Sequence, residues 1–348
     1  MQPIEVGILG ATGTVGQQFI NLLSRHPWFR ATWLAASERS EGRAYRDAAP
    51  WRLPGSIPDA VADRKVEQAT PGNGPRLVFS ALDAAVAGEL ELAFAEAGHV
   101  VVSNARNYRM EADVPLLVPE VNADHLQLLK TQAAERGWKG AIVTNPNCVA
   151  VPLSMALAPL RRYGIKSCLV TSLQAVSGAG YPGVASLDIL GNVIPFIAGE
   201  EPKVEAETRK ILGTFKPTGV DVHPMAVSAQ TTRVPVIDGH TVSIACALEQ
   251  QPDVDELRAA IEGFTGVPQQ LELPTAPAKP LLYLDAPNRP QPRFDADRDG
   301  GMTVTIGRLR PCPVLGYKMF ALGHNTVRGA AGAAILNAEL MKAQGYLG

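Results

Sequence analysis

The chain has 348 residues, of which 46% are hydrophobic and 19% are charged, and its formal net charge is −2. This near-neutral balance gives no support for a nucleic-acid or membrane-surface partner, and no apolar run reaches the about 20 residues of a membrane-spanning helix. The N-terminus lacks the regions of a signal peptide, and the four cysteines lack metal-ligand spacing. We therefore expect reduced thiols, a cytoplasmic location and no metal.

Strands and helices alternate over the first 145 residues. We expect strands at residues 4–9, 31–37, 77–81, 100–103 and 141–144, with helices at 15–24 and 84–97. Alternation of this kind predicts an α/β fold that begins with a Rossmann-like, doubly wound parallel sheet with helices on both faces.

The pattern changes in the second half of the chain. A helix is expected at 149–162 and strands at 168–174, 242–248 and 302–308, whereas the proline-rich stretch 267–293 suggests extended loop and edge. These elements predict an α+β catalytic and dimerisation domain. A helix over 325–341, rich in small residues, is expected to return to the first domain. The predicted domains are therefore 1–147 plus 325–348, and 148–324.

A glycine-rich turn, Gly10-Ala-Thr-Gly-Thr-Val-Gly16, joins the first strand to the first helix. In this position the backbone N–H groups can face the pyrophosphate of a dinucleotide. A tight turn with close strand–helix packing is the purely structural alternative. The residues expected to contact a cofactor here are Gly10, Thr12, Gly13, Thr14 and Val15.

The end of the second strand should distinguish the two nicotinamide cofactors. It reads Ser37-Glu38-Arg39-Ser40, and an arginine at this place can accept the 2′-phosphate of NADP. We predict NADP, with Ser37, Arg39 and Ser40 as contacts. Glu38 leaves NAD open, because a carboxylate could bind the ribose hydroxyl instead.

Cys148 follows the strand at 141–144 and precedes a helix, in the segment Asn145-Pro-Asn-Cys148. A helix N-terminus stabilises an anion, so we expect it to lower the pKa of the thiol and favour a nucleophilic thiolate. The flanking Asn145 and Asn147 are expected to offer N–H groups to an oxyanion. A buried cysteine in an apolar helix is the plain alternative.

A thiolate enzyme also needs an acid or base. His240 precedes a strand and stands seven residues after Arg233, whose guanidinium could bind a carboxylate bidentately. A histidine beside a turn is more often structural, so the residues alone leave this assignment open.

Over nearly its full length the chain resembles the aspartate-semialdehyde dehydrogenase family, particularly its archaeal and fungal branch. The matching segments occur in the family's order and are Gly10–Gly16, Ser37–Ser40, Ser103–Met110, Asn145–Cys148, Gln174–Gly180, Gly199–Lys203, Arg233–His240 and Asn325.

The resemblance implies a reaction in which Cys148 attacks an acyl phosphate, phosphate leaves, and hydride from NADPH reduces the thioester to an aldehyde. It implies proton transfer by His240, orientation of the acyl group by Gln174, and dimers or tetramers. It also implies the following contacts: Arg109 and Lys203 with phosphate, Arg233 with the substrate carboxylate, Glu201 with its ammonium group, and Ser80, Ser177, Gly178 and Asn325 with the cofactor. The apolar segment 189–197 would suit a subunit interface.

One departure concerns the residues after the nucleophile. The family commonly has a Ser-Thr pair there, whereas this chain has Val149-Ala150. Malonyl-CoA reductases of the same branch also vary at this place, so a CoA thioester is the alternative acyl donor. A non-catalytic nucleotide-binding paralogue is a second alternative. An N-acetylglutamyl-phosphate reductase ranks lower, because an acetylated amine does not need the Glu201 partner.

Overall fold

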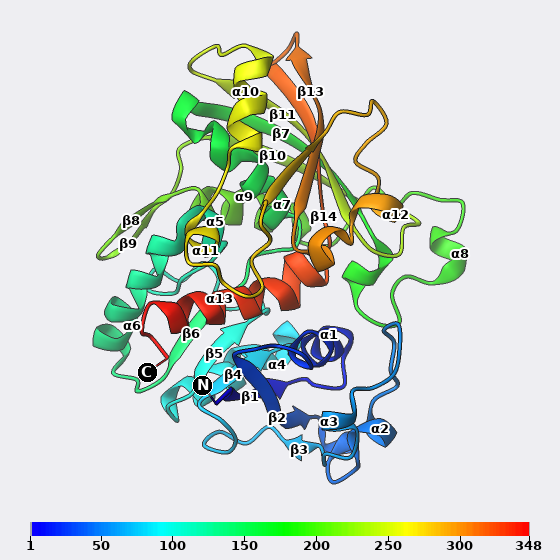
Figure 1. Cartoon of the computed structure of the whole chain (residues 1–348), viewed down its shortest axis with the longest axis vertical. Coiled ribbons are helices and arrows are strands. Elements are labelled where there is room, and N and C mark those ends of the chain that lie inside the picture. The colour runs from blue at the N-terminus through cyan, green and yellow to red at the C-terminus, as the bar shows by residue number, and fades with distance from the viewer. Residues whose placement is uncertain (1, 348) are drawn as a thin grey trace.

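The first half of the chain forms a six-stranded parallel sheet in the computed structural model, which describes residues 2–347 (Figure 1). The sheet order is β3-β2-β1-β4-β5-β6, the doubly wound arrangement expected from the sequence. Its strands are β1 (Ile4–Leu9), β2 (Phe29–Ala36), β3 (Glu67–Gln68), β4 (Leu77–Ser80), β5 (Val100–Ser103) and β6 (Ala141–Thr144). The second strand begins two residues before the predicted start, and β3 was not predicted.

Both faces of this sheet are covered, because successive side chains of a strand point to opposite sides. In β4, Leu77 and Phe79 pack in one core with Phe19, whereas Val78 packs in another with Phe94. Phe19 belongs to α1 (Thr14–Leu23), and Phe94 to α4 (Ala84–Glu96). The other helices of this half are α2 (Tyr45–Ala48), α3 (Asp59–Ala62), α5 (Pro119–Asn122) and α6 (Leu128–Arg136).

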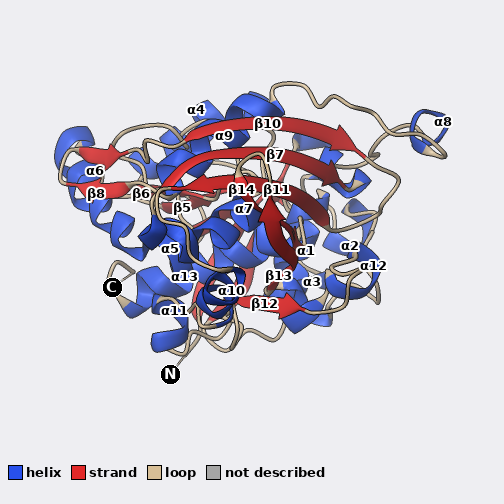
Figure 2. Ribbon diagram, turned by 90° about the horizontal axis from the view of Figure 1, so that it is seen from above, coloured by secondary structure: helices blue, strands red, loops and turns tan. Residues whose placement is uncertain are grey.

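The second half contains a six-stranded mixed sheet with the order β10-β7-β11-β14-β13-β12, as Figure 2 shows from above. Its strands are β7 (Ile165–Gln174), β10 (Ala226–Arg233), β11 (His240–Leu248), β12 (Leu281–Leu284), β13 (Val304–Cys312) and β14 (Gly316–Gly323). A separate hairpin is formed by β8 (Thr214–Lys216) and β9 (Gly219–Asp221). The sequence predicted β7, β11 and β13 and missed the others.

The helices of the second half depart from prediction in two places. The expected helix 149–162 is α7 (Ala150–Leu157) followed by a 3₁₀ segment, Ala158–Tyr163. Pro159 at the start of that segment has no N–H to continue the α-helical pattern. The stretch 267–293 contains β12, α11 (Val267–Gln270) and α12 (Pro292–Asp295), so it is not only loop. The remaining helices are α8 (Ser186–Ile189), α9 (Glu200–Ile211) and α10 (Val254–Glu262).

The C-terminal helix packs in the core of the first sheet. It begins as a π-helical segment, Val327–Ala331, and continues as α13 (Gly332–Ala343). Ile335 and Leu336 join the core that contains Phe19 and Phe79, and Figure 1 shows α13 running between the two halves. Within residues 2–347, no helix has the length and apolar character needed to cross a membrane.

Candidate active site

Cys148 lies where β6 leads into α7. The side-chain oxygen of Asn147 accepts the N–H of Val149, the residue directly before α7, at 2.8 Å and so orders the turn that leads into the helix. Cys148 is free and half-buried, and it lines a cavity of about 410 Å³. The thiol therefore lies at the N-terminal end of α7 with access to a space that could hold a small molecule.

This cavity continues into a neighbouring cavity of about 500 Å³ at the glycine turn. The two share six lining residues: Thr14, Val15, Leu82, Asp83, Gly178 and Gly180. Thr12 and Gly13 line the glycine-turn cavity, whereas Arg109, Ser177, Lys203 and Asn325 line the cavity of Cys148. A continuous space therefore leads from the glycine turn to the nucleophile.

The environment of the thiol raises its pKa to about 12, contrary to the expectation of a lowered value. Burial is the main cause, and the negative charge of Glu200 adds to it. Arg109, Arg233 and Lys203 act in the opposite direction. The position at the helix N-terminus does not by itself produce a thiolate here, because burial disfavours the charged form more strongly.

Most N–H groups of the two asparagines before Cys148 donate to protein partners. The backbone N–H of Asn147 donates to Glu207 at 2.5 Å and its side-chain amide to Glu200 at 2.7 Å. The side chain of Asn145 donates to Asn104 and to the carbonyl of Ala330. These bonds hold the turn in place. Within residues 2–347 they leave one N–H of the Asn147 side chain, which lines the cavity, without an acceptor, so an oxyanion contact by Asn147 stays a prediction.

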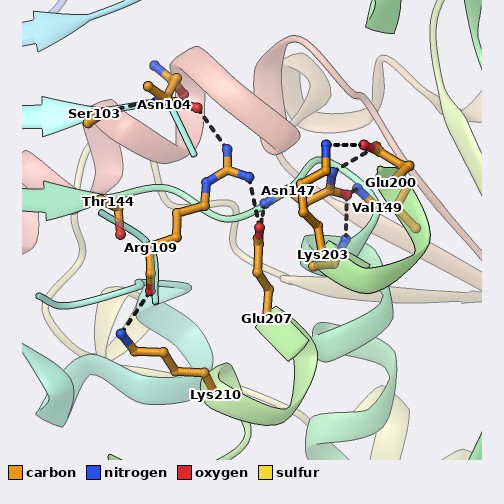
Figure 3. Close-up of polar contacts among 12 residues, drawn as sticks. Ser103, Asn104, Arg109, Thr144, Asn147, Val149, Glu200, Lys203, Glu207 and Lys210 are labelled. Carbon is orange, nitrogen blue, oxygen red and sulfur yellow. Dashed lines mark hydrogen bonds and ion pairs between the residues drawn. The ribbon is translucent and has the colours of Figure 1, made fainter. Parts of the chain in front are cut away.

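The two cations predicted to bind phosphate both lie at the cavity, and each pairs with a carboxylate of α9 (Figure 3). Arg109 donates to Glu207 at 3.0 Å and to the carbonyl of Asn104 at 2.7 Å. Lys203 donates to Glu200 at 2.5 Å. Arg109 also has a buried Nε that, within the described residues, lacks a hydrogen-bond partner. That N–H is a donor available to an anionic ligand.

Glu200, which the sequence did not single out, is the glutamate that faces the site. It lines the cavity and accepts a hydrogen bond from Gln174 at 3.2 Å. The predicted residue, Glu201, instead accepts the backbone N–H of Thr231 in β10 at 3.0 Å and does not line the cavity. Adjacent helical residues point about 100° apart, so the two neighbouring carboxylates lie on different faces of α9, and that of Glu200 faces the cavity.

Arg233 and His240 meet beside Gly178, a residue of the cavity wall. A Cβ on Gly178 would lie 2.9 Å from Arg233 Nη1 and 2.9 Å from His240 Nε2. His240 is fully buried, and burial lowers its pKa to about 3. Its Nδ1 accepts the N–H of Ala175 at 3.1 Å, which leaves the proton of the neutral ring on Nε2. Nε2 has no partner within residues 2–347, so His240 presents an unused donor beside the cavity wall.

Asn325 links Ser177, in the wall of the Cys148 cavity, to Gly239, the residue directly before His240. Its amide nitrogen donates to Ser177 Oγ at 2.8 Å, and its oxygen accepts the N–H of Gly239 at 2.8 Å. Asn325 is nearly fully buried. The predicted cofactor residues Ser177, Gly178 and Asn325 therefore lie together, next to the predicted acid/base.

The glycine turn has the geometry of a dinucleotide cradle. Gly10 has φ of +75°, and a Cβ there would lie 2.7 Å from the carbonyl oxygen of Ala81. A Cβ on Gly16 would lie 2.3 Å from the oxygen of Gly10, so only glycine allows this approach of turn and helix. Gly13, the N-cap of α1, provides no side-chain cap. The start of α1 is thus left open to an anionic group such as a pyrophosphate.

Some predicted cofactor residues lie outside both cavities. Ser37, Arg39 and Ser40 follow β2, where Arg39 is exposed, and Ser80 is fully buried at the end of β4. The sequence missed Arg52, whose guanidinium lies 3.9 Å from the ring centroid of Tyr181. Arg52 and Tyr181 both line the glycine-turn cavity. No local signal could pair them, because they come from distant parts of the chain.

Comparison with known proteins identifies the family. Residues 5–129 match the family model described as semialdehyde dehydrogenase, NAD binding domain, and residues 157–328 match semialdehyde dehydrogenase, dimerisation domain. The aspartate-semialdehyde dehydrogenase of Archaeoglobus fulgidus is 50% identical over 97% of both chains. The chain belongs to the aspartate-semialdehyde dehydrogenase family. The enzyme of that name from Candida albicans is 46% identical over 99% of both chains.

Solved structures of this family share the fold. The crystal structure of aspartate-semialdehyde dehydrogenase with NADP from Candida albicans has a TM-score of 0.91 and 43% identity, and covers 99% of both chains. Aspartate-semialdehyde dehydrogenase II complexed with ASA from Vibrio cholerae has a TM-score of 0.78 and 25% identity, and covers 98% of this chain and 99% of the other. The resemblance to the archaeal and fungal branch and the fold class are therefore confirmed.

Proposed function

We propose that the protein is an NADP-dependent aspartate-semialdehyde dehydrogenase. It converts L-aspartyl 4-phosphate and NADPH into L-aspartate 4-semialdehyde, phosphate and NADP, in the synthesis of lysine, threonine, methionine and isoleucine. The observation that carries the proposal is the position of Cys148 at the end of a space that begins at the glycine turn. Membership of the family supports the same activity.

The residues around the two cavities fit a dinucleotide. The backbone from Gly10 to Val15 would hold the pyrophosphate, Ser177, Gly178 and Asn325 the nicotinamide end, and Ser37, Arg39 and Ser40 the 2′-phosphate. Bound NADPH supplies the hydride. The side chain of Ser80 is fully buried, so it would support the residues around this site without touching the cofactor.

The substrate groups match the charges near Cys148. Arg109 and Lys203 would bind phosphate, and Arg233 the α-carboxylate. We assign the α-ammonium to Glu200 in place of Glu201, because Glu200 is the carboxylate that lines the cavity. An ammonium paired with Glu200 would offset the charge that raises the pKa of the thiol, so substrate binding favours the thiolate.

The chemistry at carbon uses three side chains. Cys148 sulfur forms a bond to the acyl carbon, the bond to phosphate breaks, and a thioester results. Gln174, held by Ser172 at 2.9 Å and by Glu200, would orient the acyl group. His240, neutral with its proton on Nε2, would donate a hydrogen bond to the oxygen that carries the negative charge after hydride transfer. That oxyanion re-forms the carbonyl of the aldehyde as the carbon–sulfur bond breaks and Cys148 leaves as a thiolate.

The departure at Val149-Ala150 does not change the cavity. Both residues are fully buried in the core of the second half, and neither lines the space around Cys148. This arrangement supports an acyl phosphate as readily as in relatives that carry Ser-Thr. The CoA thioester remains the alternative donor to be tested.

The deciding experiment is an assay with aspartate semialdehyde. We expect NADPH formation that requires phosphate, runs faster with NADP than with NAD, and is lost in Cys148→Ala. If the rate of NADPH formation from aspartate semialdehyde stays at background while malonyl-CoA drives NADPH oxidation, the protein is instead an acyl-CoA reductase. Normal turnover by Cys148→Ala would exclude the thioester mechanism.

We further propose a cytoplasmic homodimer or homotetramer with domains at 1–147 plus 325–348 and at 148–324. The segment 189–197 supports an interface, since Leu190, Val193 and Phe196 are exposed and the adjoining α8 projects from the body in both views (Figures 1 and 2). The backbone of Ile194 pairs with that of Arg233, so subunit contact would also support the site. Monomeric elution at working concentration would count against this assembly.

A further inference from the structure

A stripe of four charged residues runs along one side of α9. Glu200, Lys203, Glu207 and Lys210 are spaced three, four and three residues apart, which places them on a common helical face. Glu200, Glu207 and Lys210 are each less than 10% exposed. Charged side chains are seldom buried unless they are paired. This face therefore holds specific partners in place.

Glu207 connects two parts of the proposed site through its two carboxylate oxygens. Oε1 accepts from Arg109 Nη1 at 3.0 Å, and Oε2 accepts from the backbone N–H of Asn147 at 2.5 Å. Figure 3 shows Glu207 reaching between these two residues. One partner is the proposed phosphate-binding cation, and the other directly precedes the nucleophile, Cys148.

Lys210, one helical turn further along, fixes the segment that carries Arg109. Its ammonium group donates to the backbone carbonyls of Arg109 at 2.8 Å, Glu111 at 2.7 Å and Val114 at 3.0 Å. The carbonyl of Asn104 restrains the far side of the guanidinium at 2.7 Å. The orientation of Arg109 is thus set by Glu207 at one end of the guanidinium and by Asn104 at the other.

We infer that Glu207 is a positioning residue for the reaction at Cys148, because it holds the guanidinium of Arg109 and the Asn147–Cys148 turn at a fixed separation. The inference rests on the proposed function, in which a phosphate group must meet Arg109 while its acyl carbon meets Cys148. Glu207 does not line the cavity, so it acts through these two partners and does not touch the substrate.

Glu207→Gln is the informative variant, because an amide keeps the size but can accept with only one of its two end atoms. The NH₂ group would then face either Arg109 or the N–H of Asn147. In either case two hydrogen-bond donors would face each other and one of the two bonds would be lost. The matched control is Glu205→Gln on the same helix. Glu205 also accepts a backbone N–H, that of Ala229 at 2.9 Å, but this bond leads to β10 and not to the site.

Steady-state kinetics with phosphate and aspartate semialdehyde test the inference. We expect Glu207→Gln to raise the KM for phosphate at least about tenfold and to lower kcat about 10- to 100-fold, as for small misplacements of reacting groups. The KM for the semialdehyde should stay within about twofold, and Glu205→Gln should leave all three values within about twofold. An equal increase in KM for phosphate and for the semialdehyde, or KM and kcat values like those of the wild type, would overturn the inference.

Two further measurements separate positioning from general damage. In an Arg109→Ala background, Glu207→Gln should change the phosphate KM less than about twofold, because the two residues act as a unit; additive losses would contradict this. If Glu207→Gln does not fold, Glu207→Asp replaces it, since aspartate keeps the charge but is too short to reach both partners. For this variant too, the KM for phosphate should rise while the KM for the semialdehyde stays within about twofold.

Alkylation of Cys148 by iodoacetamide needs no substrate, so it distinguishes failure of the inference from failure of the proposed function. Its rate should change at least about threefold in the Glu207 variants and not in Glu205→Gln, as expected for a displaced nucleophile. An unchanged alkylation rate would count against positioning of Cys148. Absence of phosphate-dependent turnover in the wild-type protein would instead refute the proposed activity.

Discussion

Gly329 lies directly against Cys148. A Cβ on Gly329 would lie 3.0 Å from the Cα of Cys148 and 2.7 Å from its Cβ, and the second distance is one that real Cβ atoms essentially never show. Gly329 belongs to the π-helical segment Val327–Ala331, where its N–H donates to the carbonyl of His324 at 2.9 Å. Single π turns occur frequently at functional sites. Here the π turn brings the backbone of Gly329 into contact with Cys148.

This contact predicts the effect of Gly329→Ala. The added methyl group must displace Cys148 or the π turn, so we expect kcat to fall about 10- to 100-fold, with a changed rate of Cys148 alkylation. Gly88→Ala in α4 is the control, because its new Cβ meets only the end of the flexible Asn107 side chain. Wild-type kcat in Gly329→Ala would show that the close approach does not set the position of Cys148.

The pKa of the Cys148 thiol should respond to the charge of Glu200. Glu200 raises this pKa and Lys203 lowers it. Glu200→Gln removes a nearby anion, so the thiol should react faster with iodoacetamide at a fixed alkaline pH, by about tenfold if the pKa falls by one unit. Lys203→Gln should slow the same reaction. Rates that move together in the two variants would contradict an electrostatic cause.

His240 should make folding stability depend on pH in acid. Its pKa is lowered from 6.5 to about 3 by burial, so below pH 6.5 the unfolded chain binds a proton that the folded chain excludes. Stability associated with this group is complete above pH 6.5. It falls by about 1.4 kcal/mol per pH unit as the pH drops toward 3.

The variant His240→Gln isolates this effect. The difference in free energy of unfolding between wild type and variant should move in favour of the variant as the pH falls from 7 to 5, as measured by urea unfolding. The variant should also lose about 100-fold or more in kcat, the range for an acid/base residue. A difference in stability that is the same at both pH values would show that His240 is not held neutral by burial.

The sequence predicts the first sheet well because its signals are local. Strands such as Ile4–Leu9 are short apolar runs between turns, and the glycine turn and Cys148 each follow a strand of that sheet. Parallel strands present their carboxyl ends at one edge, so the two motifs were expected to meet, and they line a continuous space.

The charged face of α9 could not be predicted in the same way. Glu200, Glu207 and Lys210 have the composition of an exposed helix, and the packing of α9 against α7 and the segment of Arg109 buries them. The raised pKa of the thiol has the same origin, because burial depends on contacts between distant segments. The sequence could not distinguish Glu200 from Glu201, because which of them faces the cavity depends on the rotation of a helix whose buried side looks polar.

The preference for NADP over NAD should depend on Arg39, which is exposed after β2. A charge-assisted hydrogen bond to the 2′-phosphate contributes about 1.5–3 kcal/mol, so Arg39→Ala should lower kcat/KM for NADP about 10- to 100-fold. NAD lacks this phosphate, and its kcat/KM should change by less than about twofold. Arg46→Ala, which removes a nearby surface cation paired with Asp63, is the control and should leave both cofactors unaffected. If Arg39→Ala lowers kcat/KM equally for NADP and NAD, the arginine does not bind the 2′-phosphate. Glu38 would then determine the cofactor, by binding the ribose hydroxyl of NAD.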